Sequence, residues 1–166
     1  MAWSLNAPEL PSGSAWEQEK SISGRANHWS LSGKLYIARL NGNQFAIKAQ
    51  LTSDNGSYGT YYPPEKWKLR CDIGGVAGTE DTSKDVSKGT TTFYFVGEAG
   101  DGVAITVNVG GVSAAVPTKT VSFVAPALLG DTIWLNVNGI PKRTNRVFLN
   151  VNGTAKEVLI KFNKGE

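Results

Sequence analysis

Apolar and polar residues alternate along several short stretches of this chain, which is the pattern of half-buried β-strands. The clearest alternation covers 28–32 and 34–40 and returns over 44–51, with Asn41-Gly42 between the two runs. Because Asn-Gly favours the positive φ angles of a type I′ turn, the sequence predicts a β-hairpin here. Further strands are predicted at 66–73, 90–96, 103–109 and 119–124.

The connections between these stretches contain the residues that end regular structure. Gly, Pro, Asn and Ser cluster at 53–65, 74–89 and 97–102, and no stretch has a 3.6-residue apolar period. Short strands bounded by turns at this spacing are typical of a β-sandwich. We therefore predict an all-β chain in which 28–126 form a β-sandwich of immunoglobulin-like general shape.

The N-terminal part of the chain lacks this regular alternation. Pro8, Pro11 and Gly13 interrupt it, and these residues disfavour helices and strands. For 1–27 we predict an extended arm, with one strand near 19–24.

A short repeat follows a junction at 127–130. The stretch 133–142 recurs as 147–156, and each copy combines an alternating strand, an Asn-Gly turn and a return strand. The region 131–166 is therefore predicted to form two linked β-hairpins. Two hairpins alone bury little surface, so we expect them to pack on the sandwich or on another subunit.

Charge adds little to this picture. The 166 residues carry a net charge of +3, with Lys and Arg scattered among Asp and Glu, which does not favour nucleic-acid binding. No apolar stretch is long enough to cross a membrane, and the first residues lack the basic and apolar regions of a signal peptide. We expect no nucleic-acid or membrane partner, and synthesis in a cytoplasm.

Residues that could support catalysis are few. His28 is the single histidine, and the single cysteine, Cys71, falls on the apolar phase of its strand, where a buried thiol is expected. Glu65, Glu80 and Asp81 fall in predicted loops, where unpaired carboxylates are mostly solvated, and no acidic loop offers enough ligands for Ca²⁺. We predict no catalytic residues, no metal site and no cofactor.

Two groups of side chains are candidates for binding. Trp3, Leu5, Leu10 and Trp16 lie in the otherwise polar arm, and two alternatives remain open for them. They dock on a partner protein, as exposed tryptophans often do, or the two tryptophans fold back onto the sandwich.

The second group is a set of tyrosines in the loop 53–65. If exposed, Tyr58, Tyr61 and Tyr62 would stack on sugar rings and offer hydroxyl groups for hydrogen bonds. The alternative is a plain connection, stiffened by Pro63-Pro64, in which Tyr62 packs at the start of the next strand.

The repeated Leu-Asn-Val-Asn-Gly of 135–139 and 149–153 resembles the short terminal repeats of tail-fibre, baseplate and other minor tail proteins of bacteriophages from Gram-positive hosts. The stretches 29–36 and 91–95 look like the β-sandwich modules of the same proteins. In the fuller repeat an aromatic residue often follows Asn-Gly-Thr, and Ala155 departs from that pattern, as Ile140-Pro141 does in the first copy.

The resemblance implies a structural virion protein of a tail or baseplate, without enzymatic activity. It would assemble with other virion proteins through β-sheet surfaces and contribute to attachment to host cell-wall saccharides. Such fibres are commonly homotrimers, so the resemblance also implies a homo-oligomer. Two alternatives stay open: a capsid decoration or head-fibre protein, and a free carbohydrate-binding module.

Overall fold

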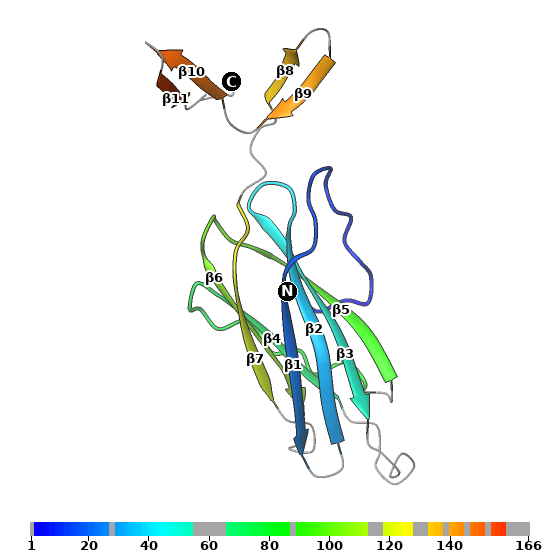
Figure 1. Cartoon of the computed structure of the whole chain (residues 1–166). Coiled ribbons are helices and arrows are strands. Elements are labelled where there is room, and N and C mark those ends of the chain that lie inside the picture. The colour runs from blue at the N-terminus through cyan, green and yellow to red at the C-terminus, as the bar shows by residue number, and fades with distance from the viewer. Residues whose placement is uncertain are drawn as a thin grey trace. The chain divides into compact units, whose positions relative to one another are not determined.

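The computed structural model describes residues 2–26, 29–54, 66–86, 89–112 and 118–127, and the backbone of four later strands between 133 and 158. The chain divides into two compact units, Met1–Leu128 and Leu129–Glu166. The described residues form strands and turns without a helix, which confirms the predicted all-β class (Figure 1).

The first unit contains two antiparallel sheets. The four-stranded sheet has the order β1-β2-β3-β5, and the three-stranded sheet has the order β4-β6-β7. The strands of the four-stranded sheet are β1 (Glu17–Ala26), β2 (Trp29–Arg39), β3 (Gln44–Asp54) and β5 (Gly89–Glu98). The strands of the three-stranded sheet are β4 (Trp67–Ile73), β6 (Ala104–Gly111) and β7 (Lys119–Val124).

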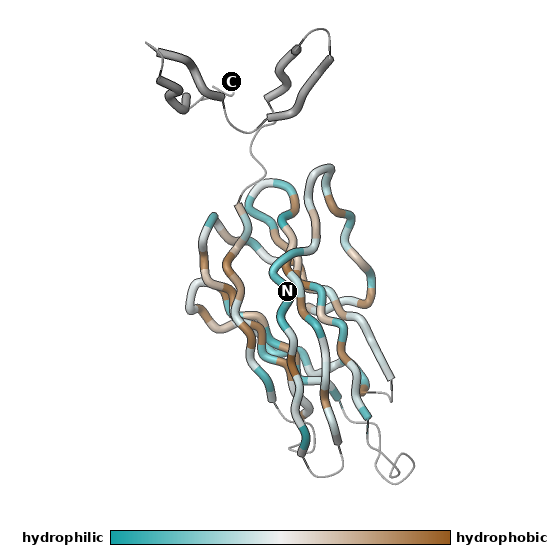
Figure 2. The backbone as a smooth tube through the Cα atoms, viewed as in Figure 1, coloured by the Kyte–Doolittle hydropathy of each residue, from teal (hydrophilic) through white to brown (hydrophobic). Residues whose placement is uncertain are grey.

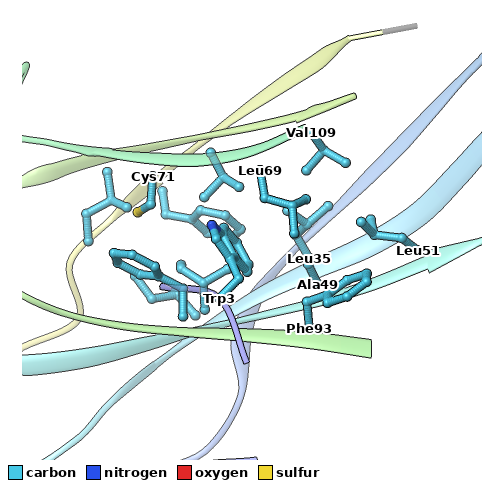
Figure 3. Packing of buried hydrophobic residues seen from close by; sticks show 14 of the residues in the cluster. Trp3, Leu35, Ala49, Leu51, Leu69, Cys71, Phe93 and Val109 are labelled. Atoms are coloured by element: carbon cyan, nitrogen blue, oxygen red, sulfur yellow. The ribbon is translucent and has the colours of Figure 1, made fainter. Parts of the chain in front are cut away.

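An apolar core lies between the two sheets. Along the strands, hydrophobic positions alternate with hydrophilic ones, so that each strand turns one side to the core (Figure 2). Leu35 and Phe93 from the four-stranded sheet face Leu69 and Cys71 from β4 (Figure 3). The rings of Trp67 and Phe93 meet edge to face, with centroids 6.2 Å apart. The sequence therefore gives a β-sandwich, as predicted.

The division into four and three strands matches an immunoglobulin constant-type domain in general shape, but the connections differ. In an immunoglobulin domain the third strand lies in the opposite sheet from the second. Here β1, β2 and β3 form a continuous meander within one sheet, and the chain changes sheets first between β3 and β4. The Asn-Gly hairpin predicted between 34–40 and 44–51 keeps β3 beside β2.

The hairpin is confirmed, but its predicted turn type is wrong. Gln44 N donates a hydrogen bond to Asn41 O at 3.1 Å, so Gly42 and Asn43 are the two central residues of the turn. Gly42 has a φ of +56°, whereas Asn43 has no positive φ. A positive φ at the first central position alone is typical of a type II′ turn, in which glycine takes that position.

The predicted arm 1–27 is also shorter than expected. Its second half, Glu17–Ala26, is the first strand of the four-stranded sheet, which confirms the strand near 19–24 and extends it. The strand begins at a register irregularity between Glu17 and Lys20, where Gln18 has a φ of +52°. The Gln18 amide donates to Val124 O at 2.7 Å and accepts from Val124 N at 3.1 Å. One side chain thus joins the edge of β1 to the edge of β7.

The second unit contains the two predicted hairpins. β8 (Ile133–Val137) pairs with β9 (Ile140–Thr144), and β10 (Val147–Val151) pairs with β11 (Thr154–Val158), each antiparallel. The Asn-Gly positions at the two tips lie outside the described residues. The pairing of 137 with 140 and of 151 with 154 gives both hairpins two-residue connections, as the repeat predicts.

A buried arginine holds one end of the sandwich together. The Arg39 side chain is 2% exposed and donates hydrogen bonds to three carbonyl oxygens, those of Asn43, Ala99 and Pro126. Asp101 lies 3.6 Å from the same guanidinium group. Burial lowers the pKa of Arg39, and the nearby charge of Asp101 opposes this shift.

We predict that Arg39→Met lowers the free energy of unfolding by about 3 kcal/mol, because three carbonyl groups lose a charged donor. Urea denaturation followed by tryptophan fluorescence measures the change. Lys68→Met is the matched control, since Lys68 is 43% exposed and makes a single ion pair with Glu80 at 3.0 Å; it should cost less than ~1 kcal/mol. Equal losses in the two variants would contradict this role for Arg39.

Candidate functional site

The N-terminal segment adds a short strand to the edge of β5. Ser4 N donates to Tyr94 O at 2.8 Å, and Tyr94 N donates to Ser4 O at 2.8 Å, an antiparallel bridge. Trp3 N donates to Asp81 Oδ2 at 3.1 Å. Two residues are therefore held by their backbone to two different parts of the sandwich.

The Trp3 ring enters the core between the sheets. It is 2% exposed, its centroid lies 5.4 Å from that of Phe95, and Figure 3 places it among Leu35, Leu69 and Cys71. Its Nε1 atom is buried without a hydrogen-bond partner. Of the two alternatives left open for the arm, folding back onto the sandwich is the one found for Trp3. Because the Trp3 ring is buried in the core of its own sandwich, it is not accessible to a partner protein in this arrangement. Docking of Trp3 on a partner would require the segment to leave the core first.

The other three arm residues lie at the surface to different degrees. Leu5 is 61% exposed, and Leu10 is half-buried. Trp16 is also half-buried and lies over Tyr94, with the ring centroids 6.0 Å apart. Leu5 is thus the arm residue that remains available for contact with another molecule.

Asp81 anchors the N-terminal segment from the side of β4. Burial opposes its ionisation, but hydrogen bonds from Ser83 and from Trp3 N, together with the charge of Lys84, outweigh this effect and lower the pKa of Asp81. The carboxylate therefore stays charged when it accepts the Trp3 amide. Asp81 also pairs with Leu69 through two backbone hydrogen bonds, which fixes its position beside β4.

The outer face of the four-stranded sheet carries a shallow hollow of about 370 Å³. Most of its lining side chains bear hydroxyl, amide or ammonium groups. They are Ser21, Ser32, Lys34, Gln50, Thr52 and Thr90, with Ile22 and Gly33 completing the wall. The strand register arranges them in rows, because Ser32 pairs with Thr52 and Thr52 with Thr90, and Lys34 pairs with Gln50. Such a surface offers several hydrogen-bond donors and acceptors at strand spacing.

An aromatic and charged row borders this hollow. Lys48 Nζ lies 4.2 Å from the centroid of the Tyr36 ring and 5.0 Å from that of Trp16, within cation–π distance. Tyr36 donates a hydrogen bond to Glu19 at 2.8 Å, and Lys34 forms an ion pair with the same carboxylate at 2.8 Å. Hydrogen bonds from Lys34 and Tyr36 lower the pKa of Glu19. Together the hollow and this row form a polar surface with ring faces at one end.

Several predicted candidates lie outside the described residues. Tyr58, Tyr61 and Tyr62 belong to this group, as do His28 and Glu65. The proposed stacking of the three tyrosines on sugar rings therefore stays a prediction.

Cys71 occupies the buried position that the alternation of its strand predicts. It is 2% exposed, and burial raises the pKa of its thiol to about 12, with a smaller contribution from the charge of Asp72. An apolar hollow of about 240 Å³ lies beside it, lined by Ile73, Val76 and Phe95 among others. The thiol is protonated at neutral pH and therefore unsuited to act as a nucleophile.

Neither a metal cluster nor a membrane span is found in the part of the chain that the structure describes. Those residues bring no three His, Cys, Asp or Glu side chains into a group that could hold an ion. They also form no helix of the length and apolar character that a bilayer requires. Comparisons with protein-family models, with curated proteins and with solved structures gave no match for this chain.

Sequence reasoning missed the two polar side chains that join distant parts of the sandwich. Arg39 lies on the same face of β2 as the apolar residues Leu35 and Ile37, because alternate residues of a strand share a face. This position is the signal from which its burial could have been predicted. Gln18 gave no such signal, because its role depends on a local irregularity in β1. The hollow was also missed, since the alignment of its residues depends on the register between strands.

We predict that the thiol of Cys71 reacts at least ~100-fold more slowly with Ellman's reagent at pH 8 in the native protein than in the unfolded chain, because burial suppresses the thiolate. The absorbance of the released thiolate measures the rate. The same sample in guanidinium chloride is the control and should react completely. Equal rates in the two states would show that the cysteine is accessible.

Proposed function

We propose that this protein is a structural component of a bacteriophage tail or baseplate that assembles through its β-sheet surfaces. The observation that carries the proposal is the division of the C-terminal unit into two separate two-stranded ladders, β8–β9 and β10–β11. A two-stranded hairpin is marginally stable at best in water unless another surface covers it. Assembly with neighbouring subunits supplies such a surface.

The register of the two hairpins supports the same proposal. One pair in each hairpin is apolar on both strands, Val137 opposite Ile140 and Val147 opposite Val158. The alternate positions of the two repeats carry an aromatic residue, Trp134 or Phe148, followed by an asparagine. Each hairpin thus has apolar residues that an assembly would bring against a surface on another subunit.

The phage assignment is supported by the resemblance of the Leu-Asn-Val-Asn-Gly repeat to terminal repeats of phage tail proteins, together with the β-sandwich that precedes it. Immunogold electron microscopy on particles purified from the source culture tests it. An antibody against the chain should label a tail or baseplate. Label confined to the capsid would favour a decoration protein, and unlabelled particles would contradict a virion role.

We predict that replacing Leu135 and Leu149 together by Asp weakens self-association at least ~100-fold, because burying two carboxylates in an apolar contact is costly. Light scattering over a dilution series measures the change. The matched control replaces Asn136 and Asn150 by Asp, which adds the same charge at neighbouring positions of the same strands and should leave association nearly unchanged. Equal effects would point to charge alone and contradict the apolar contact.

Saccharide binding is a second candidate, favoured by the hollow on the outer face of the four-stranded sheet. Its hydroxyl, amide and ammonium groups match the hydrogen-bonding needs of sugar hydroxyls, and Tyr36, two residues after Lys34 on β2, places an aromatic ring nearby. This surface would serve a tail protein in attachment and a free module in glycan binding.

We predict that Gln50→Ala lowers affinity for soluble cell-wall glycan fragments at least ~10-fold, because the hollow then lacks a central amide. Isothermal titration calorimetry measures the affinity. Lys68→Ala, on the three-stranded sheet, is the matched control and should bind as the unchanged protein does. An unchanged affinity in Gln50→Ala would remove this hollow as the site.

A further inference from the structure

The contact made by the N-terminal segment has the form of peptide recognition by a sheet edge. One residue pair extends the sheet, between Ser4 and Tyr94, and one aromatic side chain, that of Trp3, fills a gap between the sheets. Backbone pairing with an anchored side chain is how extended peptides bind to exposed strands. We call the gap between β4 and β5 that the Trp3 ring fills the seam. The edge of β5 and the seam together form a binding site for a short segment, and the chain's own N-terminus occupies it.

The segment is linked to the rest of the sandwich by a long connection. Nine residues, 5–13, lie between Ser4 and Ser14, and the Ser14 hydroxyl is held by a hydrogen bond to Arg39 O. From Arg39 to Tyr94 the sheet spans two strand spacings, about 10 Å, and three residues along a strand, about 10 Å more. Nine extended residues reach ~30 Å. The connection is thus longer than the path within its own molecule requires.

Part of this connection is exposed. Leu5, Asn6, Ala7 and Glu9 are exposed, whereas Pro8, Leu10 and Pro11 are half-buried. Gln18 and the pairing of β1 with β2 fix the following strand independently of the segment. The strand order of the sheet therefore does not depend on the segment.

The surroundings of the seam also expose apolar surface. Leu5 is 61% exposed and Val76 is 72% exposed. Val76 lines the 240 Å³ hollow together with Phe95, the residue against which Trp3 packs. A neighbouring copy that donates its segment would bring its own Leu5 to this region, where apolar surface is still available.

We infer that the N-terminal segment Trp3–Ser4 is exchanged between copies of this chain, each copy inserting its Trp3 ring into the β4/β5 seam of the next. The contacts are the same within one molecule and between two, so protein concentration sets the balance. The inference rests on the proposed function as an assembling subunit and names the partner, a second copy, and its site. Head-to-tail donation of this kind closes into a ring or continues as a filament.

A pair of introduced cysteines distinguishes insertion of the segment into its own molecule from insertion into a second copy. In the double variant S4C/Y94C the two new thiols face each other across a hydrogen-bonded strand pair, whose Cα separation suits a disulfide. Mild oxidation at increasing protein concentration, followed by a non-reducing denaturing gel, shows whether they join one chain or two. The single variants S4C and Y94C are the controls for cross-links that involve Cys71 or random encounters.

We expect covalent dimers and larger species whose share rises with concentration in the double variant and stays at background in the single variants. A disulfide confined to monomers at every concentration would overturn the exchange. In that case the proposed function would still stand if the chain self-associates and the antibody still labels particles. The two failures are therefore distinguishable.

Discussion

The backbone groups at the edges of a β-sheet need partners, and this requirement organises the described part of the molecule. Uncovered edges invite pairing with other chains. At β1 the Gln18 amide supplies a pair of hydrogen bonds to Val124 and joins the two sheets. At β4 the segment that contains Asp81 and Lys84 pairs with Leu69 and Trp67. At β5 the cover consists of one bridge, which the N-terminal segment makes between Ser4 and Tyr94.

The buried guanidinium of Arg39 solves a related problem at one end of the sandwich. Three loops meet there, and their carbonyl oxygens at Asn43, Ala99 and Pro126 converge on this one guanidinium group. A single planar cation satisfies all three, which an apolar side chain could not do. Because the carbonyl of Arg39 also accepts the Ser14 hydroxyl, the same residue ties the arm to this end of the sheet.

The fold was predictable from the sequence to the extent that alternation and turn residues determine it. The strands from β2 to β7, the burial of Cys71 and both C-terminal hairpins follow from local patterns. The type II′ turn at Gly42 did not, because Asn-Gly allows two placements of the central pair and the register of β3 selects one. The burial of Trp3 was not predictable either, because its hydrogen-bond partner Asp81 lies 78 residues away and no local sequence pattern indicates the contact. The hydroxyl-lined hollow required strand register, which the sequence alone does not give.

Besides the Ser14 hydrogen bond to Arg39, the arm has two aromatic attachments whose physical bases differ. At the C-terminal end of the arm, the half-buried Trp16 packs on Tyr94 and has the Lys48 ammonium over its ring, so that cation–π attraction contributes. At its near end Trp3 is buried, and its stability comes from apolar area removed from water. A buried ring with an unsatisfied Nε1 gives up part of that gain to the cost of an unpaired donor. The unpaired donor thus weakens the Trp3 contact without abolishing it, while the Trp16 contact holds the arm over Tyr94 at the residue before β1.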